Sequence, residues 1–250
     1  MRYYILLIAL SFSLSSSAQI LNVESLRKVT DTSGFSGTAS LRFALKRNTR
    51  DFLTIASNIH LQYKMKRHLI LFKNDVAFQQ IEGDQFENSL ISHIRYNYRI
   101  HKQIKWEIFL QGQNNKVTLI DFRGLIGAGP RFKLSTNENY RFYLGTLAMY
   151  EYEDLNDGIT PVQKDFRGSL YFSLALYPLE NLSFSSTTYY QPKFSQLNDY
   201  RISSQSSLLI SVFKKIAFLI DYTFTFDTFP AAGIPNSQFE FTTGLAYSFD

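Results

Sequence analysis

The sequence predicts an all-β fold, a transmembrane antiparallel up-and-down β-barrel of about 12 strands. Three observations predict it: long stretches in which apolar and polar residues alternate, an aromatic content of 16%, and charged residues on the polar side of the alternation. Successive side chains of a strand point to opposite faces, so this alternation gives each strand one apolar and one polar face. An apolar outer face and a polar inner face are typical of a membrane barrel.

The clearest alternation lies at the end of the chain. Every second residue of 216–226 is apolar or aromatic, whereas Asp221 lies on the other face. After the turn-rich residues 230–236 the pattern resumes over 239–249, with Glu240 on the polar side. Both stretches exceed the roughly 9–11 residues that a tilted membrane strand needs.

The same alternation, with turn signals between the segments, recurs along most of the chain. It predicts twelve strands, at 37–46, 51–63, 69–79, 86–98, 105–113, 119–134, 139–151, 166–177, 181–191, 199–212, 216–227 and 238–249. Two strands fit less well, because Asn74, Ser204 and Ser206 fall on the side that would face lipid. An even number of strands returns the C-terminus to the side from which the barrel starts.

The N-terminus predicts export. A positive start at Arg2 precedes a short apolar run over 3–12 and small residues up to Ala18. The apolar run is too short for a membrane helix, so it indicates a secretory signal peptide cleaved after Ala18. The chain then divides into a cleaved signal peptide (1–18), a periplasmic N-terminal tail (19–36) and an outer-membrane β-barrel (37–250). We therefore expect the protein in the outer membrane of a diderm bacterium.

Composition narrows the possible classes of protein. The chain has no cysteine, which excludes disulfides, thiolate metal sites and a lipoprotein anchor. Its mean hydropathy is −0.14 despite the aromatic content, as expected when each strand has one apolar and one polar face. The net charge of +5 is modest, and we attribute it to basic residues at the membrane interfaces rather than to nucleic-acid binding.

Connection lengths predict the orientation of the barrel. With a periplasmic N-terminus, the connections after even-numbered strands are short, such as 178–180. Several connections after odd-numbered strands are longer, such as 152–165 and 228–237. Short periplasmic turns and longer outer loops are the usual arrangement.

Charged residues at inward positions are the candidate lumen-lining residues. They are Arg95, Arg99, Glu107, Arg123, Arg131, Arg141, Arg167, Arg201, Asp221 and Glu240. Two interpretations stay open: an interior filled by ion pairs, or a polar pore that selects solutes. Side chains fill a barrel of eight strands and 16–18 strands leave a channel, so we favour a packed or narrowly open interior for twelve.

We expect no catalytic residues, cofactor or metal. The alternative of a lipid-modifying hydrolase requires a nucleophile and a histidine base at the outer rim. His68 and His101 fall in predicted periplasmic turns, and His60 and His93 face the predicted lumen. A further alternative is a surface-exposed binding protein that uses the loop 152–165.

The acidic segment of that loop has some calcium-loop character. Asp154, Asn156 and Asp157 precede Gly158, but the distal glutamate of a calcium-binding loop is missing. We interpret the segment as a solvated turn.

Two adjoining predicted strands carry a family resemblance. Trp106-Glu-Ile-Phe-Leu-Gln-Gly-Gln-Asn114 is followed by Leu119 and then by Arg123-Gly-Leu-Ile-Gly-Ala-Gly-Pro-Arg131. This arrangement resembles the domain-of-unknown-function family of small outer-membrane β-barrels that includes the salt-induced outer membrane protein. The resemblance covers most of the mature chain, apart from Pro130 where an aliphatic residue is expected. It implies an outer-membrane location and transfers no catalytic residues.

The last strand is similar to the terminal recognition strand of outer-membrane proteins. Tyr247 and Phe249 are the predicted assembly signal, displaced by one residue because Asp250 is last. The expected partners are outer-membrane lipids and lipopolysaccharide, the barrel-assembly machinery and small polar solutes, with no nucleic acid. The predicted role is a non-enzymatic envelope protein, with a narrow channel for small polar solutes as one form of it.

Overall fold

The structure is a computed structural model that describes residues 33–47, 51–81, 84–137, 139–213 and 216–247. The predicted signal peptide and most of the predicted tail lie outside these residues and stay predictions. None of the described residues forms a helix of the length and apolar character needed to cross a membrane.

The described residues form twelve strands, and each pairs with the next in antiparallel register. The strands are β1 (Gly34–Arg47), β2 (Asp51–Met65), β3 (His68–Ile81), β4 (Asp84–Arg99), β5 (Ile104–Asn115), β6 (Ile120–Lys133), β7 (Tyr140–Leu155), β8 (Gln163–Leu179), β9 (Leu182–Lys193), β10 (Gln196–Phe213), β11 (Ile216–Asp227) and β12 (Ser237–Tyr247). The predicted all-β, antiparallel up-and-down architecture is confirmed.

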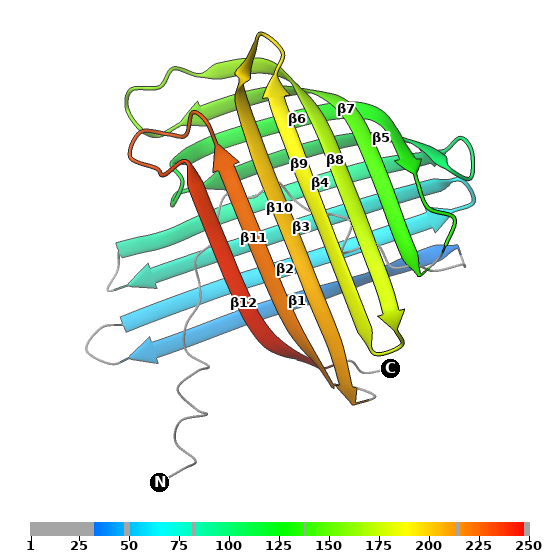
Figure 1. Cartoon of the computed structure of the whole chain (residues 1–250). Helices are drawn as coiled ribbons and strands as arrows, with labels where there is room; N and C mark the ends of the chain where they lie inside the picture. The colour runs from blue at the N-terminus through cyan, green and yellow to red at the C-terminus, as the bar shows by residue number, and fades with distance from the viewer. Residues whose placement is uncertain (1–32, 48–50, 82–83, 138, 214–215, 248–250) are drawn as a thin grey trace.

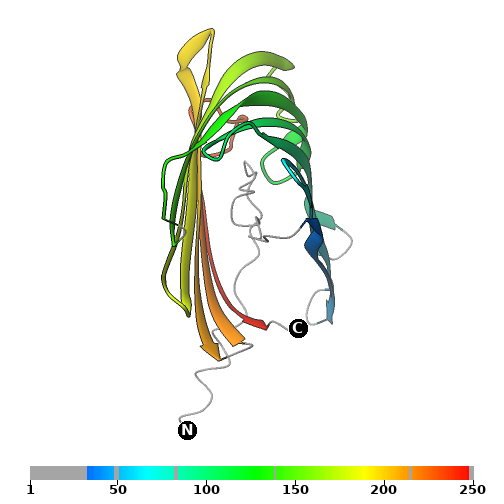
Figure 2. The ribbon, with the colours of Figure 1, turned by 90° about the vertical axis from the view of Figure 1, so that its right-hand side faces the viewer.

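The sheet is strongly curved. Figure 2 shows an arch whose opposite walls carry β1 (blue) and β12 (red). No ladder joins β1 to β12 among the described residues. We call the end with the connections after odd-numbered strands the loop end, and the opposite end the turn end. In Figure 1 the β9–β10 hairpin reaches the top at the loop end, and the β8–β9 hairpin lies at the bottom.

The two faces of the sheet have the polarity of a membrane barrel. On β5, Trp106, Ile108 and Leu110 point outward and are 41%, 44% and 55% exposed. On the alternate positions Glu107 and Gln111 point inward and are 0% and 4% exposed. In water such exposed apolar side chains would be unfavourable, whereas lipid accepts them. The predicted apolar outside and polar inside are present on this strand.

Polar residues on the outer face satisfy one another. The Asn74 amide donates to the Ser92 hydroxyl at 2.7 Å. The hydroxyls of Ser186 and Ser206 lie 2.8 Å apart, and those of Thr188 and Ser204 lie 2.9 Å apart. A polar group facing lipid is costly unless it is hydrogen-bonded, so the cross-strand partners explain why these strands tolerate hydroxyls there.

The inner face is not wholly polar, although both interpretations of the predicted lumen rest on its charged residues. A buried apolar cluster lies on the inner face of β5–β9 and comprises Phe109, Leu125, Leu147, Met149, Tyr171 and Tyr189. Tyr171 lies flat against Gly145, where an added Cβ would be only 2.0 Å from the ring. The glycine on β7 therefore makes room for an aromatic ring that fills the interior.

Candidate functional site: an ion-pair cluster on the inner face

Nine charged side chains form a network near the loop end of the inner face, which we call the ion-pair cluster. Its members are Arg123, Glu151, Glu153, Asp165, Arg167, Lys193, Asp199, Arg201 and Asp227. They come from β6 to β11, where the end of one strand lies beside the start of the next. The inward parity of each strand thus brings together charges that are far apart in sequence.

Arg201 is at the centre of the ion-pair cluster. Its Nη2 lies 2.6 Å from Glu153 Oε2, and its Nε lies 2.6 Å from Asp227 Oδ2. Its Nη1 also pairs with Glu151. Arg123 pairs with Glu153 from the other side, with Nε donating to Oε1 at 2.6 Å. One guanidinium therefore joins strands β7, β10 and β11 across the interior.

A second arginine extends the network toward β8 and β9. The Arg167 Nε lies 2.6 Å from Glu151 Oε2, and its Nη1 donates to Asp199 Oδ1 at 2.9 Å. Lys193 then pairs with Asp165 at 2.9 Å. Arg167 is 1% exposed, so its charge depends on these carboxylates rather than on water.

The ion-pair cluster contributes more to the arrangement of the strands around the interior than to the net stability of the fold. Burying charges costs several kcal/mol per ion, and the attraction of a partner roughly offsets this cost when the geometry is good. Removing one partner alone leaves a buried charge uncompensated, which is strongly destabilising. The cluster therefore fixes which strands lie opposite one another and restricts the free cross-section at the loop end.

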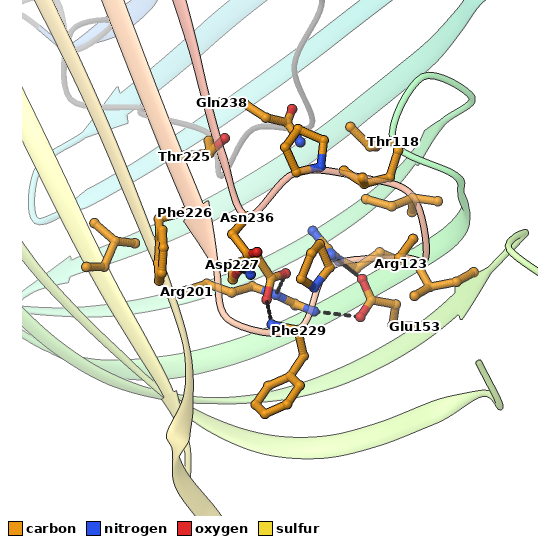
Figure 3. Close-up of a pocket in the computed structure, with 17 residues that line it drawn as sticks. Thr118, Arg123, Glu153, Arg201, Thr225, Phe226, Asp227, Phe229, Asn236 and Gln238 are labelled. Atoms are coloured by element: carbon orange, nitrogen blue, oxygen red, sulfur yellow. Dashed lines mark hydrogen bonds and ion pairs between the residues drawn. The ribbon is translucent and has the colours of Figure 1, made fainter. Parts of the chain in front are cut away.

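A small cavity lies above the ion-pair cluster, beneath the β11–β12 loop (228–236). Figure 3 shows Arg123, Arg201 and Asp227 converging with Glu153 below this loop. The cavity measures about 60 Å³. A water needs roughly 10–15 Å³ of such space, so the cavity accepts a few waters or an ion rather than a sugar-sized solute.

Asp157 ties two loops together over this end. Its carboxylate accepts from the Thr160 hydroxyl at 2.5 Å and from the backbone amide of Ala232, in the β11–β12 loop, at 3.1 Å. The Thr160 hydroxyl first, and then the amides of Thr160, Ala232 and Ile159, hold the pKa of Asp157 below its usual range. A depressed carboxyl pKa means that the contact is present above the usual pKa of about 3.9 and is lost only in stronger acid. These donors also occupy the carboxylate that the sequence places in a partial calcium loop.

Replacing Asp157 with alanine is expected to loosen the β11–β12 loop, because Ala232 loses its acceptor. Cleavage by elastase after the exposed Ala232 should then become several times faster in the refolded protein. Asp154→Ala removes the same charge nearby and serves as the control. An equal rate for the two variants would contradict the proposed link between the loops.

A second buried group lies nearer the turn end. Glu107 is paired with Arg95 at 3.3 Å and with Arg131 at 3.8 Å, and its Oε2 accepts from the Tyr171 hydroxyl at 2.7 Å. The Arg131 guanidinium also lies 3.7 Å from the centre of the Tyr143 ring, within the range of a cation–π contact. Here a single carboxylate balances two guanidinium groups.

The ten residues predicted to line the lumen therefore occupy different environments. Arg123, Arg167 and Arg201 meet in the ion-pair cluster, and Arg95, Glu107 and Arg131 meet in the second group.

The other four candidates lie apart from both groups. Arg99 is exposed at the turn end, and Arg141 lies 5.2 Å from the centre of the Tyr177 ring. Asp221 and Glu240 are half-buried on β11 and β12. The lining of a solute path by any of these residues stays a prediction. So does the assembly signal: Tyr247 ends β12, and Phe249 lies outside the described residues.

Glu151, Asp199 and Asp227 also fall on predicted inward positions, whereas the remaining three members of the ion-pair cluster do not. Glu153, Asp165 and Lys193 each lie just past the end of a predicted strand, whereas β7, β8 and β9 continue through them. Glu153 is two residues after Glu151 and so shares its face. Continuing the alternation of inward and outward positions into the neighbouring polar residues would have placed all three on the inner face.

Two of the described histidines, His68 and His93, have structural partners. His93 is buried, lies 2.9 Å from Gln111 Oε1 through its Nδ1 and stacks on Phe109. His68 lies 2.7 Å from the Tyr96 hydroxyl. Within the described ranges, no three histidine or acidic side chains are grouped as a metal site would require.

The curved twelve-strand sheet, with its apolar outer face and charged inner face, defines the class of protein as a porin-like β-barrel. The chain belongs to the DUF481 family, described as proteins of unknown function, which matches residues 30–249. This membership confirms the resemblance carried by residues 106–131. No curated protein sequence matches the chain significantly.

One solved structure shares the fold. The chain is similar to the NanC porin, with a TM-score of 0.51 and 9% sequence identity over 78% of this chain and 94% of that one. It also matches a structure described as a bacterial polysaccharide outer membrane secretin, with a TM-score of 0.46 and 9% identity over 86% of this chain and 91% of that one. At such identities the first likeness shows the fold alone.

Proposed function

We propose that this protein is a non-enzymatic barrel of the bacterial outer membrane that conducts small polar solutes through a narrow interior. The observation that carries the proposal is the ion-pair cluster, a set of buried charges on the inner face of a porin-like sheet. A pore lined by charges of both signs favours hydrated ions and small polar molecules over apolar ones.

The contents of the interior support a narrow path. The apolar cluster around Tyr171 fills part of it, and Arg201 connects β7 with β10 and β11. The cavity beneath the β11–β12 loop is of water size. The proposed channel therefore carries a smaller current than an open porin of 16–18 strands would.

A hydrolase receives less support from the same features. The base of a hydrolase must lie within hydrogen-bond reach of its nucleophile. His93 is buried against Phe109 and Gln111, and His68 lies beside a tyrosine at the turn end. We infer structural roles for both side chains.

Planar-bilayer recording on the refolded protein tests the proposal. We expect discrete, small conductance steps in KCl. Asp157→Ala should raise the mean conductance, since it frees the β11–β12 loop above the ion-pair cluster, whereas Asp154→Ala should not. A silent bilayer, despite insertion shown by vesicle flotation, would reject the channel and leave a structural or binding role.

A further inference from the structure

Positive charge is concentrated at the turn end of the inner face. From the level of Arg95 to the turns, the described inward positions of β2–β7 carry seven cations and one carboxylate, Glu107. The cations are Lys64, Arg95, Arg99, Lys105, Arg131, Lys133 and Arg141. The next described inward carboxylate at this level is Asp221, on β11. The ion-pair cluster at the loop end differs, with four cations and five carboxylates.

The β2–β3 turn adds two further cations to this end. Lys66 and Arg67 form the turn, and Lys66 adopts a positive φ of 52° that lets the chain reverse tightly. The turn is attached to the end of β4, because the Arg99 amide donates to the Arg67 carbonyl at 2.8 Å. The Arg99 guanidinium also donates to the Lys66 carbonyl at 3.4 Å. Three exposed cations are thus held close together by the backbone.

These cations border a small hollow of about 60 Å³ at the inner rim. Its lining includes Lys64, Lys66, Arg67, Arg99 and Lys105, and it contains no acidic residue. Guanidinium and ammonium groups placed on several sides suit an anion with several oxygens, such as phosphate or a carboxylate. The backbone contacts place the three residues side by side, so an anion has to order their side chains but not the chain itself.

We propose that the turn end of the barrel carries a binding site for small oxyanions, formed by Lys66, Arg67 and Arg99. This inference rests on the proposed channel and names its solute class: small polar anions of the phosphate or carboxylate kind. The exposed cations Lys66, Arg67 and Arg99 attract such anions to the turn-end mouth. As anions pass into the proposed channel, this site supplies further anions to its mouth.

The position of the hollow favours a soluble anion over a lipid headgroup. Lys64, Arg99 and Lys105 occupy inward positions. Arg99 and Lys105 pair directly, and Lys64 lies in the next inward row, with Asn97 and Glu107. The outward positions at the same level carry aromatic residues, such as Tyr98 and Trp106. Aromatic residues of this kind lie at the lipid interface, so the hollow opens toward the interior and not toward the bilayer.

Phosphate binding to the refolded full chain in neutral detergent tests the site. Isothermal titration with inorganic phosphate is compared between Lys66→Gln/Arg67→Gln and the control Lys116→Gln/Lys164→Gln, which removes two exposed lysines at the loop end. We expect the turn-end variant to bind at least about tenfold more weakly than the parent protein. The control should bind as the parent does.

Equal affinities of the two variants would overturn the site. So would binding to phosphatidylglycerol vesicles, lost in the turn-end variant, with no binding of inorganic phosphate, because this would assign the cations to lipid headgroups. The binding assay needs no current, so a silent bilayer rejects the channel without affecting this test. If the protein conducts, the reversal potential in a KCl gradient should favour chloride, and the turn-end variant should shift it toward potassium.

Discussion

Arg201→Met is expected to lower the free energy of unfolding by about 3–5 kcal/mol. Methionine keeps the length and apolar contacts of the side chain but leaves Glu151 and Glu153 in a buried region with less positive charge. Urea-induced unfolding of the refolded protein in lipid vesicles measures the change through its midpoint. As a control, Arg99→Met removes an exposed arginine and should cost no more than about 1 kcal/mol.

A rescue variant separates charge from packing in this experiment. Arg201→Met combined with Glu151→Gln and Glu153→Gln removes the two excess carboxylates together with the arginine. We expect it to recover much of the lost stability, since neutral amides are less costly to bury. If the triple variant were no more stable than Arg201→Met, lost packing rather than unbalanced charge would explain the effect.

Glu107→Gln should be the next most damaging change, at about 3 kcal/mol. Glutamine preserves the size and can still accept from Tyr171, but it leaves Arg95 and Arg131 without their shared carboxylate. The same urea titration measures the loss. Adding Arg95→Met to Glu107→Gln should recover part of it, and the double-mutant cycle gives the coupling between the two side chains. Strictly additive losses would contradict an ion pair at this position.

The strands could be predicted from sequence because the local signal and the fold agree. Alternation over residues such as 216–226 reports the face of each side chain directly, and the observed β11 has the predicted bounds. The inward position of Arg123 and Arg167 follows from the same count. The alternation does not give the ion-pair partner of each side chain, because this pairing depends on the register between strands. Arg201 meets Glu151, 50 residues earlier, only because both lie near the loop end.

Other features depended on contacts that alternation does not encode. β7 continues through Glu153 because its polar end pairs with β6 and β8, so an apolar pattern that ends at residue 151 underestimates the strand. In the apolar cluster, Tyr171 faces inward, and Gly145 on a neighbouring strand leaves room for its ring. Asp157 resembled a calcium ligand in sequence, yet its carboxylate is occupied by loop donors.

The central claim is that lipid covers the apolar outer face while the charges lie inside. Since the chain has no cysteine, single cysteines can be introduced at Leu110 and Ile126, which are exposed on the outer face, and spin-labelled in vesicles. We expect both labels to collide more often with oxygen, which dissolves in lipid, than with a water-soluble nickel complex. More frequent collisions with the nickel complex at both positions would contradict the claim.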